Sequence, residues 1–387
     1  MESWDLEGSS QRIPVSVLTG FLGSGKTTVL NHLIQQPELN RALVLINEFG
    51  EIGLDHDLVT HSKDEVVIEM ASGCLCCTIR GDLAKTLREA PARFARAGEL
   101  WFDRVIIETT GLADPAPILH TLMTDLSIAR QYRLDGVITT VDAVNGDNTL
   151  DRQIESVKQA AVADRLLVTK ADLAEADSLH SLQERLRDLN PAAPHIIARK
   201  GEVDPALLFN AGLYDPKTKS LDVQKWLKAE AYSESHAHKQ ASHDHDHSHS
   251  HDHGHHHHDV NRHDAHIKAL CLTIDEPIES TAFELWLDFL FELRGADLLR
   301  TKGIINIAGM EGPVVIHGVQ HIFHPALTLE EWPSDDRRSR IVFITRDIDE
   351  ATLRGTLKIL DAGRGHQPAV VMDELGETGF IRNGLWK

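Results

Sequence analysis

The chain has 387 residues, of which 42% are hydrophobic, and its formal net charge is −20. This length predicts two domains with cores of their own, since a domain usually takes roughly 100–200 residues. The acidic balance argues against a nucleic-acid binder, because such proteins need excess Lys and Arg to displace counterions from phosphates. No apolar run approaches the roughly 18 residues that span a bilayer, and the N-terminus lacks the pattern of a signal peptide. We therefore expect a cytoplasmic protein without a membrane partner.

Residues 13–211 alternate between short apolar runs and amphipathic stretches, after a tail at residues 1–12. We expect strands near Val15–Leu18, Leu43–Ile46, Val66–Met70, Val105–Ile107, Val137–Val141, Leu166–Thr169 and Ile196–Ala198. We expect helices near Gly81–Ala97, Pro117–Ala129, Arg152–Ala163 and Ser178–Asp188. Such alternation predicts an α/β fold with a mainly parallel sheet covered on both faces. A ligand of such a sheet binds at the carboxyl ends of the strands.

Residues 20–27 read Gly-Phe-Leu-Gly-Ser-Gly-Lys-Thr and match the phosphate-loop pattern G-x-x-x-x-G-K-[ST]. The preceding run, Ile13–Thr19, suits a buried strand, and Thr28–Gln36 has the pattern of a helix. A strand, a glycine-rich turn and a helix start place backbone N–H groups around a phosphate chain. Lys26 can reach the β- and γ-phosphates, and the Thr27 hydroxyl can ligate Mg²⁺. The predicted nucleotide-binding residues of this loop are Gly20, Gly23, Ser24, Gly25, Lys26, Thr27 and Thr28.

Two further motifs follow predicted strands. In Glu108-Thr-Thr-Gly111 the carboxylate can hold Mg²⁺ directly or through water, and Gly111 lets the backbone approach the γ-phosphate. A helix-capping acid followed by a turn glycine is the structural alternative. In Thr169-Lys170-Ala171-Asp172 the Asp172 carboxylate can accept the N1–H and 2-amino protons of guanine, and the Lys170 stem can lie over the base. Adenine lacks that pair of donors, so this motif favours GTP over ATP, although Thr169 stands where Asn is usual.

Three of the four cysteines, Cys74, Cys76 and Cys77, fall within four residues. This is no disulfide framework, and in a reducing compartment it indicates a metal or redox site. Two thiolates at i and i+2 can converge on one metal from a turn, and Gly73 can supply the irregular backbone that lets Cys77 join them. Three sulfurs leave one position of a tetrahedral Zn²⁺ open, which suits an exchangeable metal. Oxidation of the vicinal thiols and burial as inert cysteines are the alternatives.

The composition changes after Glu230, and residues 236–258 hold twelve histidines among Asp, Ser and Gly. This segment cannot bury enough surface to fold, so we expect residues 212–265 to be a flexible linker. Imidazole and carboxylate groups suit Zn²⁺, Ni²⁺, Cu²⁺ and Co²⁺ alike. The segment is therefore interpreted as a buffer of several weak metal sites, with a solvated spacer as the alternative.

Order returns in residues 266–387. We expect strands and helices near Leu270–Ile274, Ala282–Leu293, Gly303–Ala308, Val314–His317, Ile341–Ile344 and Ile348–Ile359. This order predicts a small α+β domain. His317, His321 and His324 lie in a predicted strand and turn, where packing or an interface fits them as well as metal ligation does.

Taken with Asn47-Glu-Phe-Gly50 and Gly73-Cys-Leu-Cys-Cys77, these motifs resemble the CobW-type GTPases. That subfamily of phosphate-loop GTPases includes proteins implicated in zinc allocation, cobalamin synthesis and nitrile hydratase activation. Arg300–Gly303 and His317–Pro325 look like its C-terminal domain. The resemblance implies zinc binding by Cys74, Cys76 and Cys77, with Glu48 or a water as the fourth ligand. It also implies that the GTP site is lined by Cys77, Thr78, Ile79, Arg80 and Gly81.

The leading hypothesis is a Mg²⁺-dependent GTPase that loads zinc and delivers it to a client metalloprotein. Lys26, Thr27 and Glu108 are its predicted catalytic residues, and we expect slow turnover that rises with a client or on dimerisation. One alternative is a GTP-regulated zinc buffer or sensor without delivery. Another is a cobalt-handling factor for cobalamin synthesis or nitrile hydratase activation, and a small-molecule kinase fits least.

Overall fold

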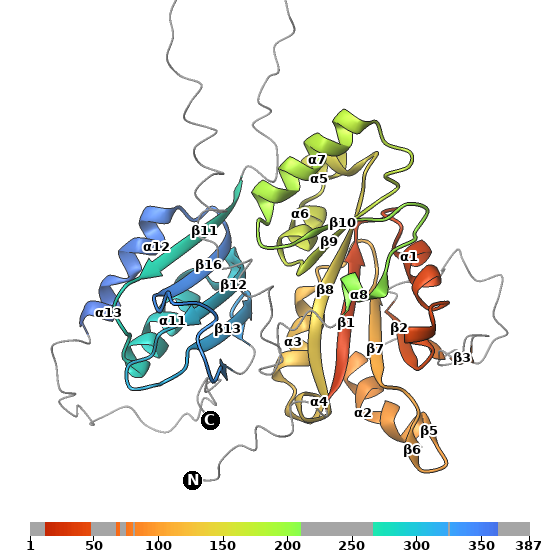
Figure 1. The fold of residues 1–387 in the computed structure, drawn as a ribbon, viewed down its shortest axis with the longest axis horizontal. Coiled ribbons are helices and arrows are strands. Elements are labelled where there is room, and N and C mark those ends of the chain that lie inside the picture. The colour runs from red at the N-terminus through yellow and green to blue at the C-terminus, as the bar shows by residue number, and fades with distance from the viewer. Residues whose placement is uncertain are drawn as a thin grey trace, which may run out of the picture.

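The computed structural model describes residues 12–47, 67–69, 75–79, 82–209, 266–323 and 326–362, and of 67–69 and 75–79 it describes the backbone. These residues form two bodies, a larger one coloured red to green and a smaller one coloured teal to blue (Figure 1). The histidine-rich segment lies outside the described residues, and the exact domain limits stay predictions. In the part of the chain that is described, no helix combines the length and the apolarity needed to cross a membrane.

The larger body is built on one sheet with the strand order β10-β9-β8-β1-β7-β2-β4-β3. Its strands are β1 (Ile13–Gly20), β2 (Ala42–Asn47), β3 (Val67–Glu69), β4 (Leu75–Ile79), β7 (Arg104–Thr109), β8 (Tyr132–Asp142), β9 (Arg165–Thr169) and β10 (His195–Ile197). All neighbours pair in parallel except β3 and β4, which are antiparallel at the edge. Strands β7 and β9 are buried throughout, which explains their continuous apolar runs. The predicted mainly parallel sheet is confirmed.

Helices cover both faces of this sheet. They are α1 (Lys26–Leu33), α2 (Leu83–Arg93), α3 (Ala116–Thr124), α4 (Leu126–Gln131), α5 (Gly146–Arg152), α6 (Ile154–Ala161), α7 (Ala176–Leu189) and α8 (Pro205–Leu208), with a 3₁₀ turn, η2, at Pro37–Leu39. Apolar side chains of α1 and α8 share one buried core, and those of α2 to α7 belong to the core on the other face. Because the helices cover the two faces of the sheet, the carboxyl ends of the strands remain accessible to a ligand.

Three predicted helices differ in extent from the observed ones. Helix α2 stops at Arg93 because a hairpin of β5 (Ala95–Arg96) and β6 (Glu99–Leu100) follows, with Gly98 at φ 83° in its turn. The stretch predicted at 117–129 is two helices, since Asp125 is extended and its carboxylate caps α4 by accepting two backbone N–H groups. The stretch predicted at 152–163 is α6, preceded by the unpredicted α5 and an extended residue, Gln153.

The cysteine segment was predicted as a turn, and this was wrong for two of its members. Cys76 and Cys77 lie within β4, whose backbone pairs in parallel register with Val44 and Leu45 of β2. The sequence Leu-Cys-Cys-Thr-Ile is apolar and partly β-branched, which suits a strand with neighbours on both sides. The strand was not predicted because the three cysteines were interpreted as ligands on a turn.

The smaller body has one antiparallel sheet in the order β11-β16-β12-β13-β14, with β15 on β13. Its elements are β11 (Ile267–Ile274), α11 (Ser280–Arg294), η4 (Gly295–Asp297), β12 (Leu298–Ile305), β13 (Val314–Val319), β14 (Ile322–Phe323), β15 (Leu327–Thr328), β16 (Ser339–Arg346), α12 (Glu350–Thr356) and α13 (Lys358–Ala362). One face of the sheet packs around Phe283, Trp286 and Phe343 with these helices. The predicted α+β domain is confirmed.

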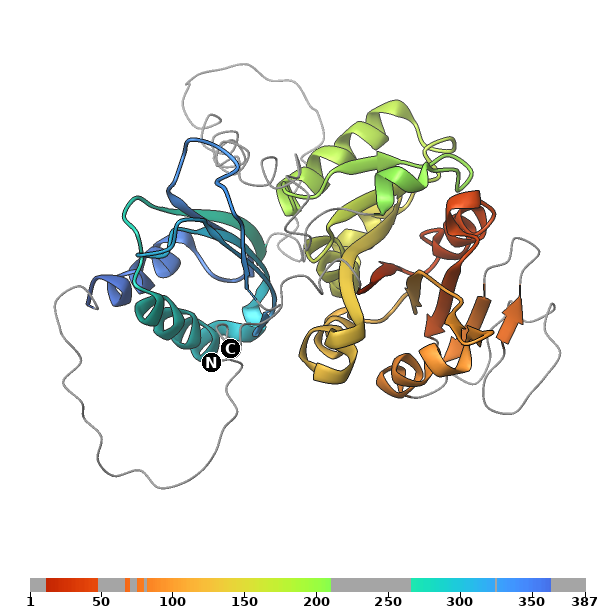
Figure 2. The same cartoon turned by 60° about the horizontal axis from the view of Figure 1, so that its bottom comes forward.

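The opposite face of the smaller sheet packs on the larger body. Leu299, Ile304 and Val315 belong to the same buried core as helices α3, α6 and α7 of the first domain. The two bodies remain side by side when the molecule is turned by 60° (Figure 2). The domains are therefore joined by a shared apolar core.

A buried ion cluster lies within this interface. The Asp164 carboxylate is 2.5 Å from Arg300 Nη2 and 2.7 Å from Lys302 Nζ, and all three side chains are at most 4% exposed. Burial alone would raise the pKa of Asp164, but the charges of Arg300 and Lys302 outweigh it and hold that pKa well below its usual range. The contribution of Asp164 to stability is therefore present above the ordinary Asp pKa of about 4 and is lost as the pH falls toward the lower folded pKa.

Replacing Asp164 with Ala should lower the free energy of unfolding by about 3–5 kcal/mol, because two buried cations would lose their counter-charge. Urea unfolding at neutral pH measures this. The matched control is Asp103→Ala, which breaks an exposed 3.7 Å pair with Arg41 and should cost about 1 kcal/mol or less. Equal losses in the two variants would contradict the assignment of Asp164 as the buried link between the domains.

Candidate nucleotide site

The phosphate loop joins the carboxyl end of β1 to the start of α1. Gly20 has φ 142°, and a side chain there would collide with the Thr140 hydroxyl. Ser24 N–H donates to the Phe21 carbonyl at 3.1 Å and closes the turn. Thr28, in the first turn of α1, is exposed. Strand, turn and helix start therefore have the order that the sequence motif predicts.

Two threonine hydroxyls from other strands fix the loop. Ser24 Oγ lies 2.6 Å from Thr140 Oγ1 at the end of β8. Thr169 Oγ1, at the end of β9, donates to the Ser24 carbonyl at 2.6 Å. Both hydroxyls are buried, so these hydrogen bonds are shielded from water. Thr169, which departs from the usual Asn, thus has a defined role in holding the loop.

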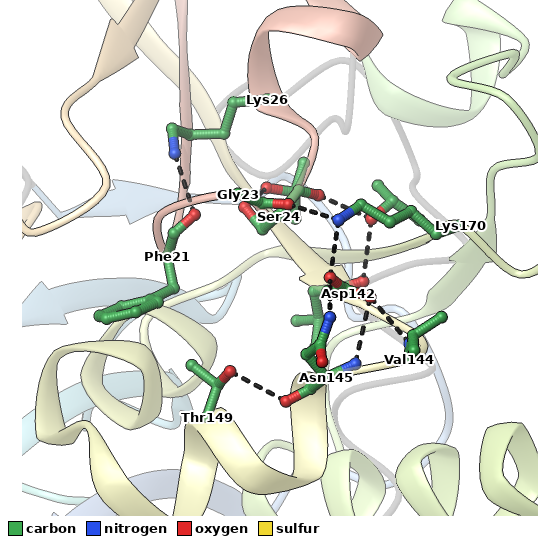
Figure 3. A network of polar contacts seen from close by, with 12 residues as sticks. Phe21, Gly23, Ser24, Lys26, Asp142, Val144, Asn145, Thr149 and Lys170 are labelled. Atoms are coloured by element: carbon green, nitrogen blue, oxygen red, sulfur yellow. Dashed lines mark hydrogen bonds and ion pairs between the residues drawn. The ribbon is translucent and has the colours of Figure 1, made fainter. Parts of the chain in front are cut away.

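Lys26 is folded back on the loop itself. Its Nζ donates to the Phe21 carbonyl at 3.1 Å (Figure 3). It also donates to the Gly20 carbonyl at 2.9 Å. Burial lowers the pKa of Lys26, and the negative charge of Glu108 opposes that effect. The ammonium is therefore poised inside the loop, where a phosphate chain would replace the carbonyls as its partner.

Thr27 and Glu108 meet although they are 81 residues apart. The Thr27 hydroxyl donates to Glu108 Oε1 at 2.9 Å. Glu108 reaches this point because β7 pairs in parallel with β1, with Leu18 opposite Glu108. A hydroxyl and a carboxylate oxygen are the ligands that Mg²⁺ prefers. These two side chains fit the predicted Mg²⁺ position.

Gly111 lies against the phosphate loop. A Cβ at this position would be 2.6 Å from the backbone nitrogen of Leu22, so only glycine allows the contact. The Gly111 carbonyl accepts a hydrogen bond from Gln159 Nε2 at 3.2 Å. Gln159 was not predicted from the sequence, because a single polar residue in an amphipathic helix gives no signal of its own.

The motif predicted to read the base is held by Asp142, a residue that was not predicted from the sequence. Asp142, at the end of β8, lies 2.7 Å from Lys170 Nζ, which also donates to the Gly23 carbonyl at 2.7 Å (Figure 3). Asp172 is exposed, and its Oδ1 accepts the backbone N–H of Lys200 at 3.2 Å. Lys170 thus links the Thr169–Asp172 motif to the phosphate loop. A carboxylate directly after the apolar run of β8 was the available signal for Asp142.

The predicted zinc ligands fall largely outside the described residues. Glu48, Cys74, Arg80 and Gly81 lie there, and of Cys76, Cys77, Thr78 and Ile79 the structure describes the backbone in β4. Strand β4 is next to β2, which is next to β7. In this register Leu45 stands opposite Cys77 on one side and Ile107, the neighbour of Glu108, on the other.

Comparison with known proteins agrees with this geometry. The model of the CobW/HypB/UreG nucleotide-binding domain matches residues 14–197, and that of the cobalamin synthesis protein cobW C-terminal domain matches residues 267–360. The zinc chaperone YjiA of Escherichia coli (strain K12) is 30% identical over 344 residues, which are 88% of this chain and 96% of the relative. The chain belongs to the CobW family.

Further relatives support that assignment over both domains. The zinc chaperone CobW of Pseudomonas aeruginosa is 31% identical over 379 residues, covering 90% of this chain and 91% of the relative. The crystal structure of the Zn(II)-bound YjiA GTPase from E. coli matches with a TM-score of 0.66 at 28% identity, covering 90% of this chain and 99% of that one. The phosphate loop described above therefore lies in the nucleotide-binding domain of a CobW-family member.

Replacing Lys26 with Ala in this CobW-family chain should reduce nucleotide hydrolysis by at least about 100-fold, because the variant loses a positive charge at the transferring phosphoryl group. The thermal unfolding midpoint should stay close to that of the wild type, which a melting curve checks. Lys85→Ala, on the exposed side of α2, is the matched control and should hydrolyse normally. A folded Lys26→Ala variant with wild-type turnover would refute this role for the loop.

Replacing Asp172 with Asn should lower the affinity for GTP by about 10- to 150-fold and leave that for ATP nearly unchanged. The variant loses a charge-assisted acceptor for guanine, which is worth roughly 1.5–3 kcal/mol. Titration with both nucleotides gives the ratio. Asp177→Asn, on the exposed first turn of α7, is the control. An unchanged GTP-to-ATP ratio in Asp172→Asn would mean that another segment reads the base.

Proposed function

We propose that this chain is a GTP-hydrolysing metallochaperone that binds zinc and transfers it to a client metalloprotein. Relatives that cover most of the chain are named zinc chaperones. A relative that matches 52% of this chain over 49% of its own length is named a zinc-regulated GTPase metalloprotein activator. The cytoplasm as its location, and self-association, are part of the same expectation.

GTP is the proposed nucleotide because Asp172 is a carboxylate at the end of β9, on the base side of the phosphate loop. Lys26 would neutralise the β- and γ-phosphates, and Thr27 with Glu108 would hold Mg²⁺. Positioning and charge neutralisation supply most of the catalysis in phosphoryl transfer. The proposed reaction is therefore Mg²⁺-dependent hydrolysis of GTP to GDP and phosphate, slow in the absence of a partner.

Zinc is proposed to bind at Cys74, Cys76 and Cys77, with Glu48 or a water completing the tetrahedron. Coupling of this metal site to the nucleotide is supported by the sheet order, in which the strand with Cys76 and Cys77 is two places from β7, the strand that contains Glu108. Neighbouring strands are about 4.8 Å apart, so the two backbones are about 10 Å apart. A γ-phosphate beside Glu108 is close enough to influence the metal ligands.

The histidine-rich segment at residues 236–258 is proposed to act as a local zinc buffer. Its imidazoles are mostly neutral at pH 7, given an ordinary pKa near 6.5, and neutral imidazole is the form that binds metal. Many weak sites beside one tight site would keep zinc close to the cysteines. The segment would then supply metal to the site that the nucleotide controls.

Zinc affinity at the cysteine site should differ between the GTP-bound and GDP-bound forms by about 5- to 150-fold, which corresponds to roughly 1–3 kcal/mol of coupling. A titration of the full chain against a competing zinc chelator, with GDP or a non-hydrolysable GTP analogue, measures this. Cys76→Ser combined with Cys77→Ser should remove the tight site and the difference. Cys271→Ser, in β11, is the matched control and should change neither.

Equal zinc affinities in the two nucleotide states would contradict the proposed switch and leave a structural site. Delivery itself is tested by turnover. A rate that rises with a client apo-metalloprotein supports a chaperone, whereas a rate set by zinc alone supports a sensor.

A further inference from the structure

Helix α6 touches the nucleotide site through one side chain. Gln159 is fully buried, and its Nε2 donates to the carbonyls of Gly111 at 3.2 Å and Ala113 at 3.0 Å. Gly111 in turn lies against the backbone of Leu22 in the phosphate loop. The Gln159 amide therefore holds the backbone of a segment that lies against the phosphate loop.

In the part of the chain that the structure describes, only the nitrogen of the Gln159 side-chain amide forms hydrogen bonds. Within the described residues, Gln159 Oε1 is buried and has no hydrogen-bond partner. An unpaired buried acceptor is unfavourable, so a purely stabilising role explains Gln159 poorly. A buried acceptor without a hydrogen bond needs an explanation. One explanation is a second conformation of the neighbouring backbone in which an N–H group donates to this oxygen.

Helix α6 is also tied to the start of α3. Lys158, next to Gln159, lies 3.5 Å from the carboxylate of Asp114, and that carboxylate accepts the Ala116 N–H at the first residue of α3. Both ends of the Gly111–Asp114 segment are thus held by α6. If the Gly111–Asp114 segment moves, α6 must move with it or these contacts must break.

The C-terminal end of α6, which carries Gln159, leads into a residue that is paired with the second domain. Asp164 follows the helix after three residues and carries the ion cluster with Arg300 and Lys302 of β12. Helix α3 reaches the same domain, with the His120 ring 5.1 Å from that of His321. The segment beside the phosphate loop is therefore connected to the C-terminal domain by two short helices.

We propose that Gln159 is a positioning residue that couples the Gly111 segment to the C-terminal domain, so that a nucleoside triphosphate and a diphosphate favour different dockings of that domain. This inference rests on the proposed binding of GTP. The terminal phosphate, absent from GDP, is the group that would draw the Gly111 backbone to a new position. Since binding linkage is reciprocal, the docking of β12 must then change the preference for triphosphate by the same factor.

The first test is the ratio of affinities for a non-hydrolysable GTP analogue and for GDP, measured on the full chain. Gln159→Met keeps the volume and removes both hydrogen bonds, and we expect it to change that ratio by at least about fivefold. Thr139→Val is the matched control, because Thr139 Oγ1 donates to the backbone carbonyl of Gln159 at 2.8 Å and does not touch Gly111. Its ratio should stay within about twofold of the wild type.

The second test asks whether the C-terminal domain takes part. Lys302→Met weakens the interface and leaves the pair of Asp164 with Arg300, so it should shift the same ratio in the wild type. In the Gln159→Met background the shift should disappear, because the coupling is already broken. Equal shifts in both backgrounds would overturn the link to the second domain.

A Gln159→Met variant that folds and keeps the wild-type ratio would overturn the positioning role while leaving the proposed function intact. Failure of the wild type to bind either nucleotide would overturn both the positioning role and the proposed function. If Gln159→Met does not fold, hydrogen exchange of the wild type decides the matter. The GTP analogue should then change exchange in α6 and β12 relative to GDP, and equal exchange there would overturn the proposal.

Discussion

The parallel pairing of β1 with β7 and β8 is the constraint on which the nucleotide site depends. It places Leu18 opposite Glu108 and Gly20 opposite Thr140, so three strands end at the same edge of the sheet. The phosphate loop begins where these ends meet. Side chains far apart in the sequence therefore converge without long or flexible connections. A shift of one residue in the pairing of β1 with β7 would separate Thr27 from Glu108.

The loop is held mainly by side-chain hydroxyls and by the amines of two lysines. Thr140 and Thr169 fix Ser24 from two strands, and Lys170 bridges Gly23 and Asp142. A short hydroxyl side chain on a buried strand end loses little conformational entropy when it forms a hydrogen bond. Such hydroxyls therefore hold the loop at a small entropic cost. This explains why Thr169 serves where Asn is usual. These contacts also connect the Thr169–Asp172 motif directly to the phosphate loop.

The interface between the domains combines an apolar core with buried charge. Replacing a buried ion cluster by apolar side chains is often neutral or stabilising, so Asp164 with Arg300 and Lys302 adds little to affinity between the domains. Its charges instead penalise any docking that would leave one of them unpaired. A defined docking geometry is what a coupling between nucleotide and C-terminal domain requires. Gln159 lies in the last turn of α6, and Asp164 lies three residues beyond the end of that helix.

The sequence alone determined the phosphate loop, the alternation of strands and helices, and the carboxylates Glu108 and Asp172 at strand ends. These features are local, since a loop motif and an apolar period are written in neighbouring residues. Only the tertiary structure decided the roles of Gln159, Asp142 and Asp164. Gln159 bonds to a carbonyl 48 residues away, and Asp164 pairs with Arg300 across 136 residues. The physical reason is that periodicity shows which face of a helix is buried, whereas the partner of a buried polar group depends on which distant backbone the fold brings to it.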